Sequence, residues 1–82
     1  MPHITIKMYP GRSEALKQRL CEELVQSTVK ALSVPQGAVS VSIEEVPKEA
    51  WGETVVKPDM LDKPEELYVK PANLQEYVTH FQ

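Results

Sequence analysis

Pro2 has the most unusual chemistry available to any residue in this 82-residue chain. Its small ring permits removal of the initiator Met1, which leaves a free secondary amine at the chain end. An α-amino group titrates at about 7.7–8.0 when unperturbed, and burial or a nearby cation lowers that value toward the range in which a general base works best. Pro2 is therefore a candidate catalytic base. The alternative is that it is simply a common second residue.

Arg12 is the second candidate, because it stands directly before Ser13, the expected N-cap of a helix. The positive end of the helix dipole mildly disfavours a cation there. A cation held beside the free N–H groups of a helix start nevertheless adds to an anion-binding site that suits a carboxylate. The alternative is a solvated arginine in a loop.

Trp51 is the only tryptophan, and Gly52 follows it. Its ring is expected either to form a wall of a hydrophobic pocket, where it would depress the pKa of the amine, or to fill the core of a small domain. His3 and His80 have no partner at a metal-ligand spacing and are expected at the surface or an interface. No metal site is predicted.

The periodicity of the chain predicts the elements that position these residues. Apolar and polar residues alternate over residues 3–8, as in a half-buried strand. Pro10 and Gly11 then break the pattern, and apolar residues at three- and four-residue steps predict one amphipathic helix over residues 13–33. Alternation resumes over residues 39–43, which predicts a second strand.

Strand, helix and strand form a βαβ unit, and a helix of this length returns the second strand parallel to the first. The fold class is therefore α/β (α+β), as one domain over residues 1–82. Its core is residues 1–53 and residues 54–82 are a C-terminal extension. Two strands make a poor sheet alone, so we expect two copies to complete a four-stranded sheet as a dimer or a larger assembly.

The C-terminal extension is less regular than the βαβ core. Several prolines interrupt it, and a short helix is expected between Pro58 and Tyr68. Residues 72–82 are expected to form a final helix or an arm that binds a partner.

The composition of the chain argues against several classes of function. The net charge is −3 and the nine Lys and Arg residues are scattered, which argues against a nucleic-acid partner. No apolar run reaches the roughly 18 residues of a membrane span, and no signal peptide is recognisable, so a cytoplasmic protein is expected. The single cysteine, Cys21, is expected to be a small core residue.

The order and spacing of these features resemble the 4-oxalocrotonate tautomerase family over residues 1–53. The matching features are the Met-Pro start, the alternating strand, Gly11-Arg12-Ser13 at the helix entrance, the long helix, the second strand and the pair Trp51-Gly52. The longer C-terminal segment is most similar to dimeric bacterial tautomerases of comparable length.

The resemblance implies a cofactor-independent isomerase, a keto–enol tautomerase that acts on small enol and keto carboxylic acids. It implies that Pro2 is the catalytic base, that Arg12 binds a substrate carboxylate and that Trp51 keeps the site apolar. Ser40 stands where well-studied members carry a second arginine from a neighbouring subunit, which argues against the dicarboxylate that names the family as substrate. The Ser40 hydroxyl, a backbone N–H or a water would then bind the developing enolate oxygen.

Two alternatives remain open from the sequence. A proline-dependent hydratase or dehalogenase of the same superfamily would need a cationic Pro2 amine. A non-catalytic oligomeric interaction module would result if Met1 were retained, because the Pro2 nitrogen would then be an amide without useful basicity. The sequence does not distinguish a homodimer from a hexamer.

Overall fold

The computed structural model describes residues 1–81, and the chain divides into two compact units, Met1–Glu45 and Val46–Gln82. This boundary lies earlier than the predicted division after residue 53. Each unit is described by itself. No helix within residues 1–81 is both long enough and apolar enough to cross a membrane.

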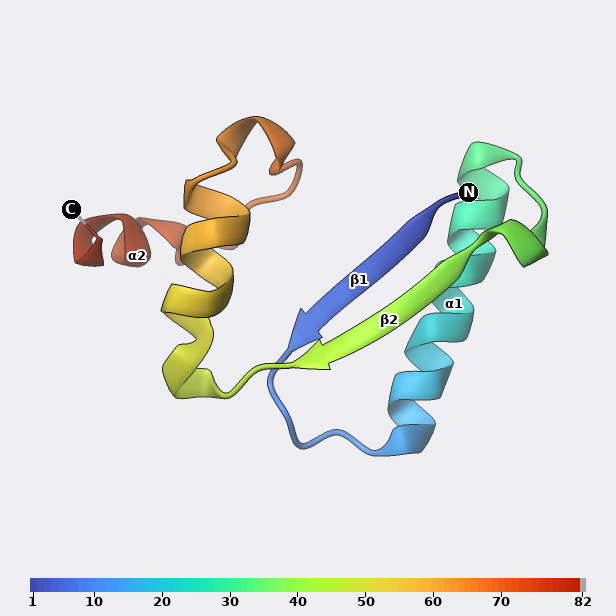
Figure 1. The fold of residues 1–82 in the computed structure, drawn as a ribbon, viewed down its shortest axis with the longest axis horizontal. Coiled ribbons are helices and arrows are strands. Elements are labelled where there is room, and N and C mark those ends of the chain that lie inside the picture. Colours follow the sequence, from blue (N-terminus) through green and yellow to red (C-terminus); the bar gives the residue numbers. More distant parts are fainter. Residues whose placement is uncertain (82) are drawn as a thin grey trace. The chain divides into compact units, whose positions relative to one another are not determined.

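The first unit is the predicted βαβ unit. It contains β1 (His3–Met8), α1 (Glu14–Leu32) and β2 (Ser40–Glu45), with the strands paired in parallel (Figure 1). His3 is opposite Ser40 and Met8 is opposite Glu45 in the register. The second strand was predicted over residues 39–43. It continues to Glu45 because the ladder pairs the polar end of β2 with the last residues of β1, which hydrophobic alternation alone does not reveal.

Local chemistry explains why α1 begins and ends where it does. Gly11 adopts φ 121°, a conformation that strains other residues, and turns the chain out of β1. The Ser13 side chain then caps the helix by accepting the N–H of Leu16 at 3.2 Å. Ser33 ends the helix in the left-handed conformation at φ 56°. The predicted helix is therefore confirmed, with Ser13 and Ser33 as its caps.

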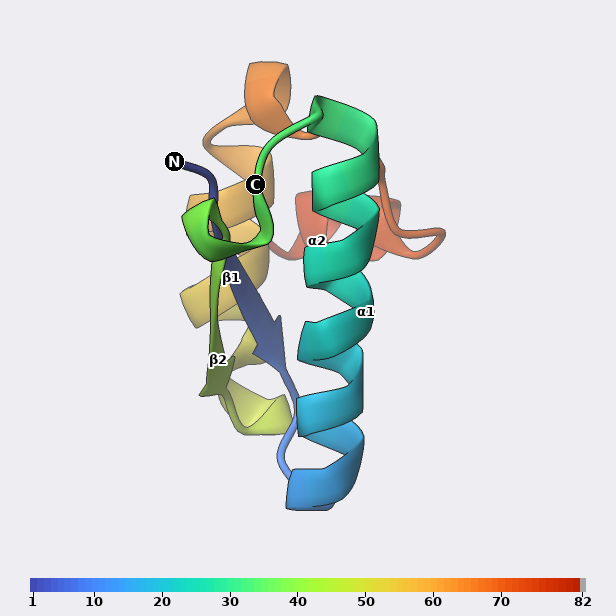
Figure 2. The same cartoon turned by 90° about the vertical axis from the view of Figure 1, so that its right-hand side faces the viewer.

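The two faces of the sheet differ, because α1 lies along one of them (Figure 2). Val41 and Ile43 line pockets together with α1 residues, which places the apolar side of β2 toward the helix. No residue within 1–45 is fully buried, since one helix on two strands cannot enclose a core. Cys21 is accordingly half-buried and does not occupy the predicted core position.

Helical turns dominate the second unit. A 3-10 turn at Lys48–Ala50 leads into a π-helix at Gly52–Leu61, followed by another 3-10 turn at Pro64–Glu66 and by α2 (Leu74–His80) (Figure 1). A short helix was expected between Pro58 and Tyr68. That span contains the 3-10 turn at Pro64–Glu66 and the end of the π-helix, which begins earlier and includes Pro58. A wide π turn is suited to this residue, whose ring would collide with the carbonyl four residues earlier in an α-helix.

The described core of the chain lies in this unit, where Val46, Val55 and Val56 are 1–4% exposed. The helix α2 contacts the π-helix, and the rings of Tyr77 and Phe81 lie over Gly52. The final segment thus forms a helix, one of its two predicted forms. Residue 82, the last of the predicted segment, lies outside the described residues.

Candidate active site

Pro2 lies at the start of the sheet, where the backbone fixes its position. Its carbonyl accepts the backbone N–H of Ser40 at 3.2 Å, which extends the parallel ladder by one bond. Pro2 is half-buried, whereas the Met1 side chain before it is fully exposed. The Pro2 backbone is thus held in place by β2.

A polar cluster lies beside Pro2 on the sheet face opposite α1. The His3 Nδ1 atom is 2.7 Å from the Ser40 Oγ atom, and the His3 Nε2 atom is 3.3 Å from the Ser42 Oγ atom. The three residues are exposed. The structure therefore places Ser40, the predicted substrate contact, next to both Pro2 and an imidazole ring.

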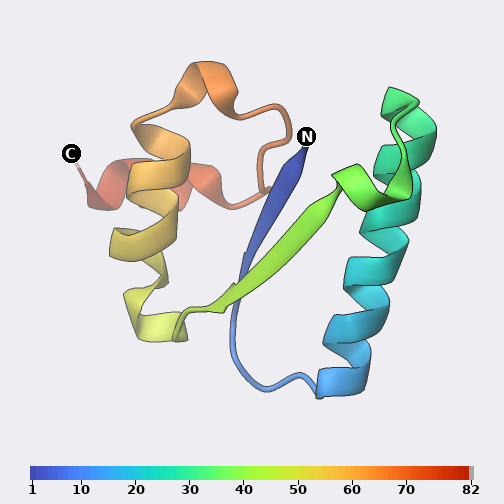
Figure 3. The same cartoon turned by 45° about the vertical axis from the view of Figure 1, so that its right-hand side comes forward.

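Arg12 lies at the other end of β1. Figure 3 shows the N-terminus and the start of β2 at one end of the sheet, and the loop into α1 at the opposite end. The six residues of β1 span about 20 Å at the usual rise of a strand. Arg12 is exposed, and no carboxylate within residues 1–81 forms an ion pair with it. One chain therefore does not bring Arg12 to Pro2.

Trp51 belongs to the second unit, where it precedes the π-helix and is half-buried. Its backbone N–H bonds the carbonyl of Lys48. A neighbouring pocket of about 230 Å³ is lined by Gly52 and by residues of α2 and the preceding turn. The role of Trp51 beside Pro2 stays a prediction, because the two residues lie in different units.

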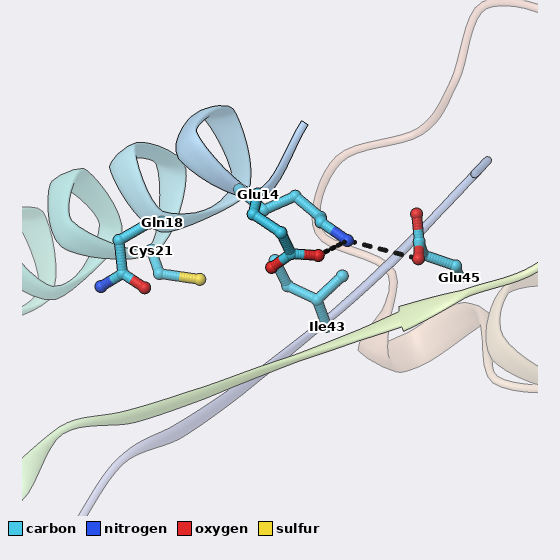
Figure 4. Close-up of a pocket in the computed structure, with 6 residues that line it drawn as sticks. Glu14, Gln18, Cys21, Ile43 and Glu45 are labelled. Atoms are coloured by element: carbon cyan, nitrogen blue, oxygen red, sulfur yellow. Dashed lines mark hydrogen bonds and ion pairs between the residues drawn. The ribbon is translucent and has the colours of Figure 1, made fainter. Parts of the chain in front are cut away.

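A further pocket, of about 300 Å³, lies between α1 and the C-terminal end of β2 (Figure 4). The Lys17 Nζ atom is 2.8 Å from the Glu14 Oε1 atom and 3.3 Å from the Glu45 Oε1 atom. The hydrogen bond to Glu14, and then that to Glu45, raise the pKa of Lys17 above 10.5, although partial burial opposes them. This lysine joins the helix to the strand, and its charge is already balanced by the two carboxylates.

The sequence predicted His3 as a surface residue, and it is exposed, but its partners were missed. Alternation put His3, Ser40 and Ser42 on polar faces of two strands. The register that brings them together depends on long-range pairing, which no local pattern contains. No group of His, Cys, Asp and Glu side chains within residues 1–81 is arranged to hold a metal ion.

Sequence comparisons identify relatives of the whole βαβ unit. The family described as "Tautomerase enzyme" matches residues 2–60. A probable tautomerase of Xylella fastidiosa is 39% identical over 71 residues, which cover 87% of each chain. The 2-hydroxymuconate tautomerase of Pseudomonas putida is 46% identical over 52 residues, which cover 63% of this chain and 82% of that protein.

Two solved structures share the fold. One is of a 4-oxalocrotonate tautomerase isozyme from Methylibium petroleiphilum, with a TM-score of 0.59 and 36% identity over 61% of this chain and 81% of that chain. The other is TomN, a 4-oxalocrotonate tautomerase homologue of tomaymycin biosynthesis, with a TM-score of 0.60 and 29% identity over 79% of this chain and 97% of that chain. The chain therefore belongs to the tautomerase family, as an α+β member of its 4-oxalocrotonate tautomerase branch and an isomerase of the keto–enol type.

Proposed function

We propose that the protein is a cofactor-independent tautomerase of small enol and keto carboxylic acids, with the Pro2 amine as general base after Met1 is removed. The observation that carries the proposal is the position of Pro2. It is half-buried at the sheet end, and the N–H of Ser40 holds its carbonyl at 3.2 Å. A base fixed in this way is already oriented before substrate binds.

The proposed reaction moves one proton. The neutral Pro2 nitrogen takes the proton of the enol hydroxyl, and the electron pair left on oxygen forms the carbonyl as the double bond shifts. The resulting ammonium returns the same proton to the neighbouring carbon. The amine is regenerated and the substrate is isomerised, so the reaction needs no oxidant, reductant or cofactor.

Negative charge develops on the enolate oxygen during this transfer and needs a hydrogen-bond donor. The Ser40 hydroxyl is the proposed donor. The Ser40 backbone N–H bonds to the Pro2 carbonyl, and Ser40 is exposed. A hydroxyl is a weaker donor than a guanidinium. We therefore expect a smaller transition-state stabilisation than a second arginine would give.

Arg12 is proposed to bind the substrate carboxylate, and it must then come from a second copy of the chain. The length of β1 separates it from Pro2 of its own chain. The first unit also needs a partner for packing, because its apolar residues are only half-buried and Leu16 and Leu32 are 55% and 58% exposed. We propose a homodimer whose sites combine residues of both copies, with Trp51 as an apolar wall.

The substrate class follows from the charges available. Relatives are named for 2-hydroxymuconate, an enol with two carboxylates. The only other arginine of this chain, Arg19, pairs with Glu23 along α1 at 3.4 Å. With Arg12 as the single unpaired guanidinium of residues 1–81, an enol monocarboxylate is the proposed substrate.

The test is the ketonisation rate of phenylenolpyruvate, a simple enol monocarboxylate, by protein with a free Pro2 amine. Pro2→Ala keeps an amine but replaces the rigid secondary amine with a primary one, and its rate should fall by at least about tenfold. The wild-type rate should rise with pH as the amine becomes neutral. A rate that instead falls as the amine loses its proton would favour the hydratase or dehalogenase reading. Equal and negligible rates in both proteins would refute the proposal.

A further inference from the structure

His3 contacts a serine with each of its two ring nitrogens. The ring spans from Ser40 to Ser42 along β2, at 2.7 Å through Nδ1 and 3.3 Å through Nε2. This arrangement uses every polar atom of the ring and fixes the plane in which it lies. All three residues are exposed, so water competes for these bonds and they contribute little to stability. What the contacts do is set the directions in which the Ser40 and Ser42 hydroxyls point.

The shorter of the two contacts connects the ring to the backbone around Pro2. His3 directly follows Pro2 in the chain, and Ser40, its partner in the ladder, donates its N–H to the Pro2 carbonyl. The imidazole, the Ser40 hydroxyl and the candidate base are thus held by adjacent residues of two paired strands. A substrate oxygen bound beside Pro2 would therefore lie at the same end of the sheet as this pair of side chains.

The hydrogen-bond chemistry of a neutral imidazole allows two arrangements, because one ring nitrogen donates and the other accepts. In the first, the Ser40 hydroxyl donates to Nδ1 and has no hydrogen left for a ligand. In the second, Nδ1–H donates to the Ser40 oxygen, while the Ser42 hydroxyl donates to Nε2. Only the second arrangement leaves the Ser40 hydrogen free to point outward.

We propose that His3 is a positioning residue that makes the Ser40 hydroxyl of the same chain a donor to the developing enolate oxygen. This inference rests on the function proposed above. Negative charge on the substrate oxygen selects the second arrangement, because that arrangement alone offers it a hydrogen. The bond from Nδ1–H to the Ser40 oxygen also polarises the hydroxyl and strengthens its donation.

The proposal is tested by a double-mutant cycle on phenylenolpyruvate ketonisation. Ser40→Ala and His3→Ala should each lower kcat by roughly tenfold or more and change KM little, because the lost bond forms mainly in the transition state. The double variant should be no slower than Ser40→Ala alone, since His3 acts through Ser40. His3→Asn keeps an N–H near the position of Nδ1 and should restore part of kcat.

Thr5→Ala is the matched control, because Thr5 is exposed on the same face of β1, opposite Ser42. It should leave kcat unchanged, and circular dichroism should show the same fold for all variants. A wild-type kcat in His3→Ala would overturn the inference. So would a double variant whose loss of kcat equals the product of the two single losses, because His3 and Ser40 would then act independently. Failure of the proposed function would look different from failure of this inference, because the wild-type protein would then show no Pro2-dependent ketonisation at all.

Discussion

Pro2 and Arg12 lie at opposite ends of β1, one before its first residue and the other in the loop that follows its last. The strand between them is rigid because its backbone is paired with β2 along its whole length. No side-chain rotation closes a separation of about 20 Å. A site that uses both residues is therefore complete only when two copies associate.

The first prediction is that two impaired variants complement each other. Pro2→Ala lacks the secondary amine, and Arg12→Gln should lose about 10- to 100-fold in kcat/KM, mostly through KM, because a charged hydrogen bond to the carboxylate is removed. Mixed dimers contain one site with both residues intact. Random mixing should restore roughly a quarter of the wild-type rate.

The control mixes Pro2→Ala with a Pro2→Ala, Arg12→Gln double variant, which should restore nothing. Native mass spectrometry confirms that mixed oligomers have formed. Mixed oligomers without recovered activity would show that Pro2 of one copy and Arg12 of another do not act in the same site.

The second prediction concerns Lys17, which joins α1 to the end of β2 through Glu45 at 3.3 Å. Its pKa is raised above 10.5 by the hydrogen bonds to Glu14 and Glu45. A raised pKa means that the stabilisation is fully present below 10.5 and is lost as the pH rises through the folded-state pKa. Lys17→Met should lower Tm at about pH 8, and the difference from wild type should shrink above that pKa.

Lys30→Met is the control for Lys17, because Lys30 is exposed in the last turn of the same helix and has no ion pair within residues 1–81. Its Tm difference from wild type should be small and should lack the same pH dependence. A Lys17→Met difference that stays constant across the alkaline range would contradict the assigned cause.

The third prediction uses Gly52, over which two aromatic rings of the C-terminal segment lie. An added Cβ would stand 3.3 Å from the Tyr77 Cε1 atom and 3.7 Å from the Phe81 Cζ atom. Gly52→Ala should therefore displace α2, at a cost of about 1 kcal/mol or more from overpacking. Faster amide exchange over residues 74–80 would report the displacement.

Gly37→Ala provides the matched comparison, because an added Cβ there has no atom within 4 Å and the backbone has no positive φ. It should be neutral or slightly stabilising, since alanine restricts the unfolded chain. Unchanged exchange over α2 in Gly52→Ala would show that Tyr77 and Phe81 move aside freely.

The sequence could predict β1 and α1 because their signals are local. The alternation of residues 3–8 and the cap at Ser13 act within a few positions of one another. The π-helix that follows Trp51 was not predicted, since Pro58 normally marks a helix start and here lies inside the helix. Its wider turns have no recognised sequence pattern.

The sequence proposes the residues of the candidate site but does not give their geometry. Pro2 and Ser40 were identified by position in the chain, and the register of β1 and β2 brings them together. The same register supplies His3 as a partner of Ser40, which spacing alone cannot reveal. The separation of Arg12 from Pro2 likewise follows from the length of a strand that the periodicity had identified.

The most direct test of the central claim changes only the chemical state of the Pro2 nitrogen. Met1-free and Met1-retaining forms of the same chain, verified by intact mass, differ in whether that nitrogen is an amine or an amide. Their ketonisation rates on phenylenolpyruvate should differ by at least about a hundredfold, with activity confined to the Met1-free form. Equal rates in the two forms would show that the Pro2 amine is not the base.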